Sequence, residues 1–464
     1  MIREIGRQVA YVLAAFAIVP PAAVSAAQPG PDTLLIRDAT LIDGTGAAPK
    51  RGVDILVRSG KITAIGHSIA PPAGARIVEA SGKYVIPGLV DAHVHLGAPV
   101  LFQLTKEERE KVVEYTPRAF LYNGVPTIRD AGSPLEWIVE RRKAQREGRL
   151  VSPRIITLGN SFKPEHGWGS RHGGGLPNAE AARRQALAFA AAGVDGFKIT
   201  IENGLGSEKS HVEIPDDMLS AVLDVAREAR LKSYVHAIGL DEYRRAAAIA
   251  PAAILHGLSE RLPADDALLA RLKTSNITIV PTASLFRSFL GYDPEAGRGL
   301  DSDSIEGSVP SFILERMRDP AFVQKERELF VKASLVQAYD WAESANPVFC
   351  DNIGKMHQGG VRIAVGTDAG GTVGYNFQGY NTPWEVKILT ECGLTPMEAL
   401  VAATRNGAEA IGVGDRLGTV EPGKIADLLI LSANPLDDIA NLRAIDWVVQ
   451  DGKLNSRQAF AYRP

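Results

Sequence analysis

The chain has 464 residues, 45% of them hydrophobic and 23% charged, which is typical of soluble globular proteins. Its formal net charge is −3 and no block of like charges occurs, so we expect no nucleic-acid partner. Two cysteines, Cys350 and Cys392, are too few for a disulfide scaffold or a cysteine-rich metal site, and the sequence does not decide whether they pair.

The first 27 residues have the pattern of a secretory signal. Arg3 and Arg7 precede an apolar run over 9–19, and small residues follow over 22–27. The run is too short to span a bilayer, so we expect cleavage after it, export to the periplasm or medium, and no stable membrane insertion afterwards. An anchoring or disordered N-terminal helix is the alternative.

Short β-like runs occur near both ends of the chain, separated by glycine and polar turns. Because they flank a helix-rich middle, they predict one small β-sandwich domain assembled from residues 28–87 and 419–464. The runs lie at 33–36, 53–57, 61–65, 427–431 and 446–449.

Residues 88–418 alternate between strand-like and helix-like segments, which is typical of parallel βαβ units. Eight strand-like runs suit a closed (β/α)₈ TIM barrel, and we therefore predict an α/β fold of that class. A helix is expected over 179–192, with Asn178 as its N-cap and Gly193 as its stop. The connection from 284 to 360 must contain helices of its own and is a candidate lid. The expected strands lie at 85–94, 125–129, 154–158, 196–200, 233–237, 253–256, 278–282 and 363–367.

Ionisable side chains stand at the ends of these strands, where barrel enzymes form their active sites. His93 and His95 lie two residues apart in a strand and so share a face, which suits a zinc-type metal, although such a pair alone could be core or surface histidines. Lys198 alternates with Phe197 and Ile199, so it is expected to point into the barrel. There it would react with carbon dioxide to form a carbamate, or extend to solvent at the strand end.

Three further candidates end later strands: His236, His256 and Asp368. Each has a structural alternative, with the histidines packed in the core and Asp368 capping a helix. Two histidines, a lysine, two more histidines and an aspartate, all at strand ends and in this order, nevertheless indicate a metal centre. Tyr234 is expected on the same face as His236.

Two longer segments complete the pattern. Residues 85–95 read V-I-P-G-L-V-D-A-H-V-H, and residues 418–428 read G-T-V-E-P-G-K-I-A-D-L. Together with the ordered ligands they resemble the amidohydrolase superfamily of metal-dependent barrels, in its two-metal subtype. The resemblance covers about residues 33–453 and is strongest to the imidazolonepropionase-like and prolidase-like branch, which includes Xaa-Pro dipeptidases and ochratoxin-type amidases.

The resemblance implies two divalent metal ions, with zinc expected and cobalt or manganese as alternatives. It also implies a carbamate, formed from carbon dioxide, on the bridging lysine, and Asp368 as general base. A Thr-Gly-Gly-His-Gly loop of this branch is replaced here by K-P-E-H-G-W-G at 163–169; His166 keeps the histidine and, with Tyr234, is expected to hold the substrate carbonyl. His172 and His211 match no motif and are expected at the surface. The implied ligands are His93, His95 and Asp368 for one ion, His236 and His256 for the other, and Lys198 for both.

These roles predict a hydrolase that cuts a carboxamide with a metal-bridging hydroxide. Its small-molecule substrate is expected to be a dipeptide or N-acyl amino acid, as for an Xaa-Pro dipeptidase or ochratoxin-like amidase. The alternatives are a deaminase, weakened because Gly239 stands where many deaminases have glutamate, and a cyclic-amide or carbamate hydrolase. A catalytically inactive scaffold barrel is the alternative of another class. We also expect a homo-oligomer.

Overall fold

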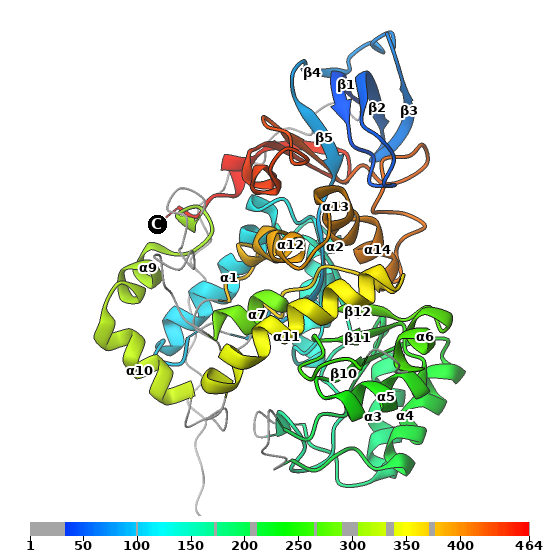
Figure 1. The fold of residues 1–464 in the computed structure, drawn as a ribbon. Coiled ribbons are helices and arrows are strands. Elements are labelled where there is room, and N and C mark those ends of the chain that lie inside the picture. Colours follow the sequence, from blue (N-terminus) through cyan, green and yellow to red (C-terminus); the bar gives the residue numbers. More distant parts are fainter. Residues whose placement is uncertain are drawn as a thin grey trace, which may run out of the picture.

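The computed structural model shows an α/β molecule with a barrel and a smaller β part, shown at the top of Figure 1. The predicted secretory signal lies outside the described residues. The structure describes residues 33–463 with the exception of 99–100, 171–173, 205–210, 264–266, 290–304, 331–337 and 371–375.

Eight parallel strands make up the barrel, in a three-stranded sheet (β6 to β8) and a five-stranded sheet (β9 to β13). Backbone hydrogen bonds join the two sheets on both sides: Asp195 N donates to Thr157 O at 2.8 Å, and Ala92 N donates to Val365 O at 2.9 Å. The predicted α/β barrel class is confirmed. The barrel strands are β6 (Val90–Val94), β7 (Thr127–Asp130), β8 (Arg154–Thr157), β9 (Gly196–Thr200), β10 (Lys232–His236), β11 (Ala253–Leu255), β12 (Thr278–Val280) and β13 (Arg362–Ile363).

Helices surround the strands (Figure 1) and bury their outward faces. Phe197 and Ile199 of β9 belong to this apolar layer, whereas Lys198 between them faces the barrel interior, as the alternation predicted. The helices are α1 (Lys106–Tyr122), α2 (Leu135–Arg146), α3 (Ala179–Ala191), α4 (Asp216–Glu228), α5 (Leu240–Ile249), α6 (Ala267–Thr274), α7 (Ala283–Ser288), α9 (Ser311–Met317), α10 (Pro320–Phe330), α11 (Ala338–Gln358), α12 (Asn381–Glu391), α13 (Pro396–Ala403) and α14 (Arg405–Ala410).

The boundaries of α3 follow from its capping residues. The Asn178 side chain accepts a hydrogen bond from Ala181 N at 2.9 Å, and the helix ends just before Gly193, whose φ of +74° favours glycine. The predicted N-cap and stop are therefore confirmed.

The long connection after β12 contains helices, as expected. Glu326 of α10 accepts hydrogen bonds from Phe102 N and Gln103 N, at 2.9 and 2.7 Å, and so ties this connection to the segment that follows β6. Cys350 of α11 and Cys392, at the end of α12, form a disulfide bond. The role of this connection as a lid stays a prediction.

The smaller part combines strands from both ends of the described chain. β14 pairs antiparallel with β5, and β5 pairs parallel with β1, so the two ends form one continuous sheet with its own apolar cluster. The strand expected over 85–94 is in fact two: Tyr84–Pro87 (β5) joins this sheet and Val90–Val94 (β6) opens the barrel. Gly88 lies between them, and its N donates to Asp427 O at 2.8 Å. A Cβ at this position would lie 2.3 Å from Pro126, so glycine is required where the chain passes from one sheet into the other.

The remaining strands of this sheet are β1 (Thr33–Leu41), β2 (Lys50–Arg58), β3 (Lys61–Gly66), β4 (Arg76–Glu79), β14 (Leu428–Leu431), β15 (Ile445–Gln450) and β16 (Lys453–Ser456), and two 3₁₀ helices accompany them, η3 (Ile439–Arg443) and η4 (Arg457–Phe460).

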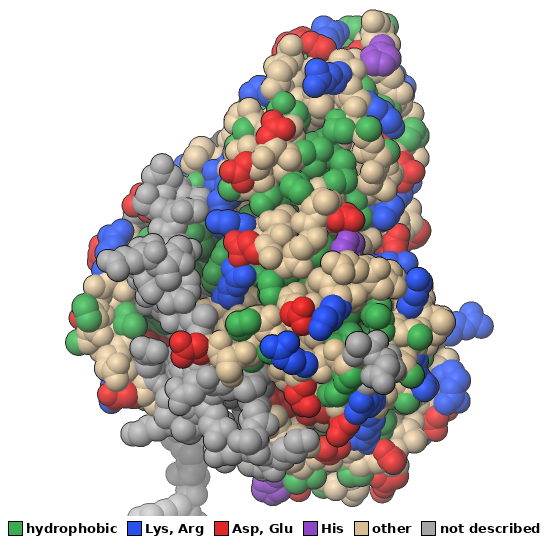
Figure 2. All heavy atoms as spheres, in the orientation of Figure 1, with side chains coloured by type: hydrophobic (Ala, Val, Ile, Leu, Met, Phe, Trp, Pro, Cys, Tyr) green, Lys and Arg blue, Asp and Glu red, His purple; other side chains and the backbone are tan. Residues whose placement is uncertain are grey.

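Charges of both signs intermingle on one face of the molecule (Figure 2). On the face drawn in Figure 2, lysine and arginine side chains alternate with aspartate and glutamate over the barrel, without a patch of one sign. Within the described part of the chain, none of the helices has the length and apolar character required to cross a bilayer.

Candidate metal centre

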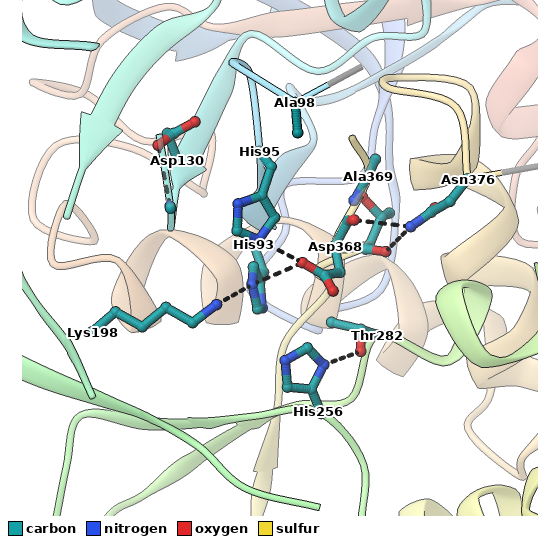
Figure 3. Close-up of polar contacts among 12 residues, drawn as sticks. His93, His95, Ala98, Asp130, Lys198, His256, Thr282, Asp368, Ala369 and Asn376 are labelled. Atoms are coloured by element: carbon teal, nitrogen blue, oxygen red, sulfur yellow. Dashed lines mark hydrogen bonds and ion pairs between the residues drawn. The ribbon is translucent and has the colours of Figure 1, made fainter. Parts of the chain in front are cut away.

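Four of the expected ligands meet at the ends of β6, β9 and β13. Asp368 Oδ1 lies 3.1 Å from His93 Nε2 and 2.8 Å from His95 Nε2. Lys198 Nζ lies 3.0 Å from the same His93 nitrogen. Figure 3 shows Asp368 facing both imidazoles and Lys198 extending toward them from the other side. Residues far apart in the sequence are thus brought within contact distance.

A buried polar network holds β6 and the segment after β13 together. Asp91 Oδ2 accepts hydrogen bonds from Thr367 Oγ1 at 2.8 Å and Thr382 Oγ1 at 2.7 Å, and Asp91 Oδ1 accepts from Thr367 N at 3.1 Å. Asn376 Nδ2 donates to the carbonyl of Asp368 at 2.9 Å (Figure 3). Asp368 itself has a positive φ of +53°, a costly conformation for a residue other than glycine, and these bonds maintain it.

The other two expected ligands form a neighbouring pair. The rings of His236 and His256 lie 4.2 Å apart between centroids, and His256 lies 4.9 Å from His93. His256 Nδ1 contacts Thr282 Oγ1 at 2.8 Å (Figure 3), and His236 Nε2 contacts a carboxylate oxygen of Glu202. His256 and Thr282 also have positive φ values, +79° and +50°.

Burial sets the protonation of these groups. It lowers the pKa of His236 to about 3 and the pKa values of His93 and His256 well below the ordinary range, so the imidazoles are neutral. It also lowers the pKa of Lys198 to about 8. Burial raises the pKa of Asp368, but the adjacent imidazoles outweigh this effect and hold that pKa well below its usual value.

The donor set fits divalent metal ions. One donor atom each from His93, His256 and Asp368 lies within 4.8 Å of the others. Among the described residues, His256 Nε2 and Asp368 Oδ1 are buried without a hydrogen bond, although Oδ1 touches two imidazole nitrogens. Buried polar atoms without a hydrogen bond cost free energy unless a ligand or a water molecule satisfies them. Neutral imidazoles and an ionised carboxylate are the states in which these groups bind metals.

A model of the amidohydrolase family matches residues 84–454, which include every expected ligand. This chain belongs to the amidohydrolase family. It is therefore a hydrolase of a family that generally uses divalent metals, and the expectation drawn from the sequence is confirmed at that level.

Known proteins that are similar to this chain support the family assignment, and their matches cover different shares of the chain. An imidazolonepropionase from Thermoanaerobacter pseudethanolicus is 24% identical over 405 residues, covering 82% of this chain and 84% of that protein. A dihydroorotase from Trichlorobacter lovleyi is 38% identical over 99 residues, but this amidohydrolase covers only 21% of its length. The crystal structure of a Xaa-Pro dipeptidase with bound methionine superposes with a TM-score of 0.72 at 23% identity, covering 91% of this chain and 100% of that chain, and so shares the fold.

Of the two residues expected to hold the substrate carbonyl, Tyr234 pairs across the sheet with the expected ligand Lys198, and His166 lies on the loop after β8. Tyr234 is 1% exposed, two residues before His236 along β10, and its ring lies 4.0 Å beneath the guanidinium of Arg129. His166 is exposed on its loop, with φ +61°. Trp168, two residues later, approaches the centre, with its ring 6.5 Å from that of His236 between centroids.

His211, expected at the surface, is partly exposed and packs edge-on against Trp168, with ring centroids 5.1 Å apart. His172 lies outside the described residues.

Two buried residues of the centre escaped the sequence analysis. Glu202 is 1% exposed, and burial raises its pKa well above the ordinary value. It continues the alternation of Lys198 and Thr200 beyond the end of β9, and this alternation was the available signal. Arg129 is fully buried, and its guanidinium lies over the ring of Tyr234. A positive charge buried in this way has no signature in the sequence.

Proposed function

We propose that this amidohydrolase cleaves a carboxamide, of the dipeptide or N-acyl amino acid type, at a centre of two divalent ions, with zinc as the expected metal. The observation that carries the proposal is the arrangement of two adjacent donor groups. His93, His95 and Asp368 would hold the first ion, and His236 and His256 the second. The full-length likeness to an imidazolonepropionase and to the Xaa-Pro dipeptidase fold supports it.

Ions bound there would supply hydroxide near neutral pH and polarise a carbonyl group. Asp368 is ionised at neutral pH, so it can take a proton from the attacking water and pass it to the leaving nitrogen as the carbon–nitrogen bond breaks. The buried position of His93, His236 and His256 excludes bulk water from the ligands and keeps their imidazoles fixed.

We further propose that Lys198 carries a carbamate that bridges the ions. Its nitrogen would bond to the carbon of carbon dioxide and lose a proton, which converts a neutral amine into an anion with two oxygen ligands. A pKa of about 8 supports this, because roughly a tenth of the amine is unprotonated at pH 7, far more than at the ordinary pKa of 10.5. A bare ammonium beside two cations would instead be repelled.

The carbamate is tested by reconstituting metal-free enzyme with zinc and labelled ¹³C-bicarbonate. We expect a carbamate carbon resonance, faster reconstitution with bicarbonate, and loss of metal and activity in Lys198→Ala, with partial rescue by a short carboxylic acid. Lys232→Ala is the control, since Lys232 is exposed at the start of β10, the end of that strand away from His236. A plain Lys198 amine in enzyme loaded with two ions would contradict the carbamate.

The substrate class is tested with a panel of dipeptides, N-acyl amino acids, cyclic amides and aminated rings, on metal-loaded and metal-stripped enzyme. We expect metal-dependent release of an amine from the linear amides. Cyclic-amide hydrolysis is the second candidate, favoured by the local match to dihydroorotases. Deamination is disfavoured, because Gly239 has no side chain and Glu242 instead accepts the backbone N–H groups of Ile238 and Gly239 at the start of α5. If the protein binds no metal and hydrolyses no compound of the panel, the alternative of an inactive scaffold would hold.

We propose that the enzyme is exported. The charged, apolar and small-residue pattern of residues 1–27 supports this. The Cys350–Cys392 bond also supports it, because disulfides persist chiefly in oxidising compartments. N-terminal sequencing of native protein should find a start near residue 28, and an intact Met1 would contradict export by cleavage.

A further inference from the structure

Lys163 is a buried lysine that is not one of the six expected ligands and has no role in the apolar core. It opens the 163–169 loop and is 8% exposed. Within the described part of the chain, its Nζ donates one hydrogen bond, to Ser161 Oγ at 3.3 Å, and forms no ion pair with a carboxylate. A lysine is rarely buried this deeply without an anionic partner, because its ammonium group loses most of its hydration.

The residue before Lys163 fixes the direction of its side chain. Phe162 forms a parallel bridge with Ile199 of β9, and its backbone N donates to Lys198 O at 2.8 Å. Phe162 and Ile199 both belong to the apolar layer between the strands and the helices. Successive side chains of extended backbone point to opposite faces, so Lys163 points to the inner face of the barrel, where Lys198 also lies.

The end of the Lys163 side chain lies near the candidate metal centre. Burial is the main cause that lowers the pKa of Lys198 to about 8, and the positive charge of Lys163 adds to this effect. A Cβ built on Gly169 would lie 3.9 Å from Lys163 Nζ. The residue before Gly169 is Trp168, whose ring lies 6.5 Å from that of His236. The ammonium group of Lys163 therefore lies at the mouth of the barrel.

This ammonium group is held in place and lacks a counter-ion among the described residues. The carbonyl of Lys163 accepts a hydrogen bond from Leu176 N at 3.0 Å, and Glu165 N donates to Leu176 O at 3.0 Å. Burial lowers the pKa of Lys163, because the charged form has lost the stabilisation that water supplies. An anion at hydrogen-bond distance from Nζ would restore that stabilisation.

We infer that Lys163 is a specificity-determining residue that binds the free carboxylate of the substrate while the adjacent centre acts on the amide. The inference rests on the proposed function and narrows it to linear amides whose leaving amine is an amino acid. In such a molecule only the amide nitrogen and the α-carbon separate the scissile carbonyl from the carboxylate, so both groups fit one barrel mouth. Arg129, another buried cation of the interior, is less suited, because its guanidinium already lies over the ring of Tyr234.

The inference is tested with pairs of substrates that differ only in the carboxylate: the best N-acyl amino acid or dipeptide of the panel, and its primary carboxamide. Wild-type enzyme should favour the acid in kcat/KM by about 10- to 100-fold, because hydrogen bonds between charged groups at a buried position contribute that much. This comparison requires no variant. Equal kcat/KM values for the acid and the carboxamide would overturn the inference.

Variants then assign the preference to Lys163. In Lys163→Met, which keeps a long side chain without its charge, the preference for the acid should disappear, chiefly through a higher KM for the acid. Lys163→Arg should keep part of the preference, and Lys163→Gln replaces the methionine variant if that variant does not fold. Both substrates of a pair meet the same metal centre, so any effect of the variant on metal binding cancels in the ratio.

Lys232→Met is the matched control, because Lys232 is exposed at the start of β10, the end of that strand away from His236. It should keep the preference of the wild-type enzyme. A purely structural role of Lys163 would lower kcat/KM for both substrates by the same factor and leave their ratio unchanged.

The outcomes separate this inference from the function on which it rests. Metal-dependent hydrolysis of linear amides, with the preference for the acid retained in the uncharged Lys163 variant, would overturn the role of Lys163 and leave the proposed function standing. A metal-loaded wild-type enzyme that hydrolyses no linear amide would overturn both.

Discussion

At the scale of single residues, the centre concentrates backbone conformations that are costly elsewhere. His256, Thr282 and Asp368 all have positive φ values and lie in the segments that follow barrel strands β11, β12 and β13. Such conformations persist only where surrounding bonds determine them, and they aim side chains that a regular strand would point elsewhere. Asp368 is the clearest case, since its carbonyl is held by Asn376 and its carboxylate meets two imidazoles.

Asp368→Asn should leave the barrel folded but lower kcat by a factor on the order of 10² or more, because an amide cannot accept the proton of the attacking water. Steady-state kinetics on the best substrate of the panel would measure this. Metal content and far-ultraviolet circular dichroism of the same preparation serve as controls. Turnover close to that of wild type at full metal occupancy would show that Asp368 has a structural role and is not the general base.

The sequence located the candidate site through residue order at strand ends, which follows directly from the period of a strand. His93, His95, Lys198 and Asp368 could be placed on this basis, and the structure brings them within contact distance. Glu202 was missed although it continues the alternation of Lys198 and Thr200, because it lies beyond the end of β9, in irregular backbone where alternation is a weaker guide to direction. Its partner also lies on a different strand, and such pairings depend on tertiary packing.

At the scale of elements, helix α12 helps to fix the position of the expected ligand His256 through helix α7. Glu385 of α12 is fully buried and accepts hydrogen bonds from Ala283 N at 2.9 Å and Ser284 N at 2.6 Å, the first residues of α7. Thr282, which caps α7, contacts His256. The position of one metal ligand therefore depends on the contact between two helices.

Glu385→Gln should lower the affinity for the second ion by about 10-fold, since an amide has one acceptor oxygen for two backbone donors and loosens the start of α7. Burial raises the pKa of Glu385 to about 7, so the comparison belongs near pH 8.5, where the wild-type side chain is ionised. Chelator competition is the measurement. Glu391→Gln is the control, because Glu391 ends the same helix and pairs with Arg287 of α7 at the surface. Equal losses in both variants would contradict the specific role of Glu385.

Element boundaries show where sequence patterns stop being informative. The caps of α3 are local, so Asn178 and Gly193 identified its ends. The run over 85–94 is mostly apolar, and although Pro87-Gly88 signals a turn within it, nothing in its periodicity shows that the two halves join different sheets. That transition depends on the contacts of Gly88 with Asp427 and Pro126, which come from distant parts of the chain. Strand β4 was missed because it is short and mostly exposed.

At the scale of the whole molecule, Asp427 joins the smaller sheet to the barrel. Its carbonyl accepts from Gly88 N at 2.8 Å, and its carboxylate lies 3.4 Å from Arg154 of β8 and accepts from Asp451 N at 2.7 Å. Burial raises the pKa of this carboxyl group from 3.8 to about 6.

Because the folded chain holds this proton more tightly than the unfolded chain, Asp427 lowers the free energy of unfolding as pH rises from about 4 to about 6. Asp427→Asn lacks this titration. We therefore expect its stability relative to wild type to improve over that interval, by at most about 3 kcal/mol. Urea unfolding of both proteins at several pH values would measure the difference, and a difference independent of pH would contradict the assignment.

The Cys350–Cys392 disulfide bond should stabilise the folded chain against unfolding. It joins residues 42 positions apart, on α11 and at the end of α12, and closing such a loop contributes roughly 2–4 kcal/mol. The double variant Cys350→Ser, Cys392→Ala should melt a few degrees below wild type under oxidising conditions, as measured by calorimetry. Under reducing conditions this gap should close. A gap that persists in reductant would mean that the substitutions act through packing instead.

The sheet shared by both chain ends has a consequence for synthesis. A chain that emerges from a ribosome or a translocation channel presents β1 to β5 long before β14, the strand that hydrogen-bonds to the free edge of β5. Until then the edge of β5 offers unpaired backbone groups to any extended segment nearby, including the same edge of another nascent chain. A chain arrested before Leu428 would keep that edge open permanently. Completing this sheet therefore comes late: β1 to β5 can pair with one another early, but β5 gains its second neighbour only when translation is almost finished.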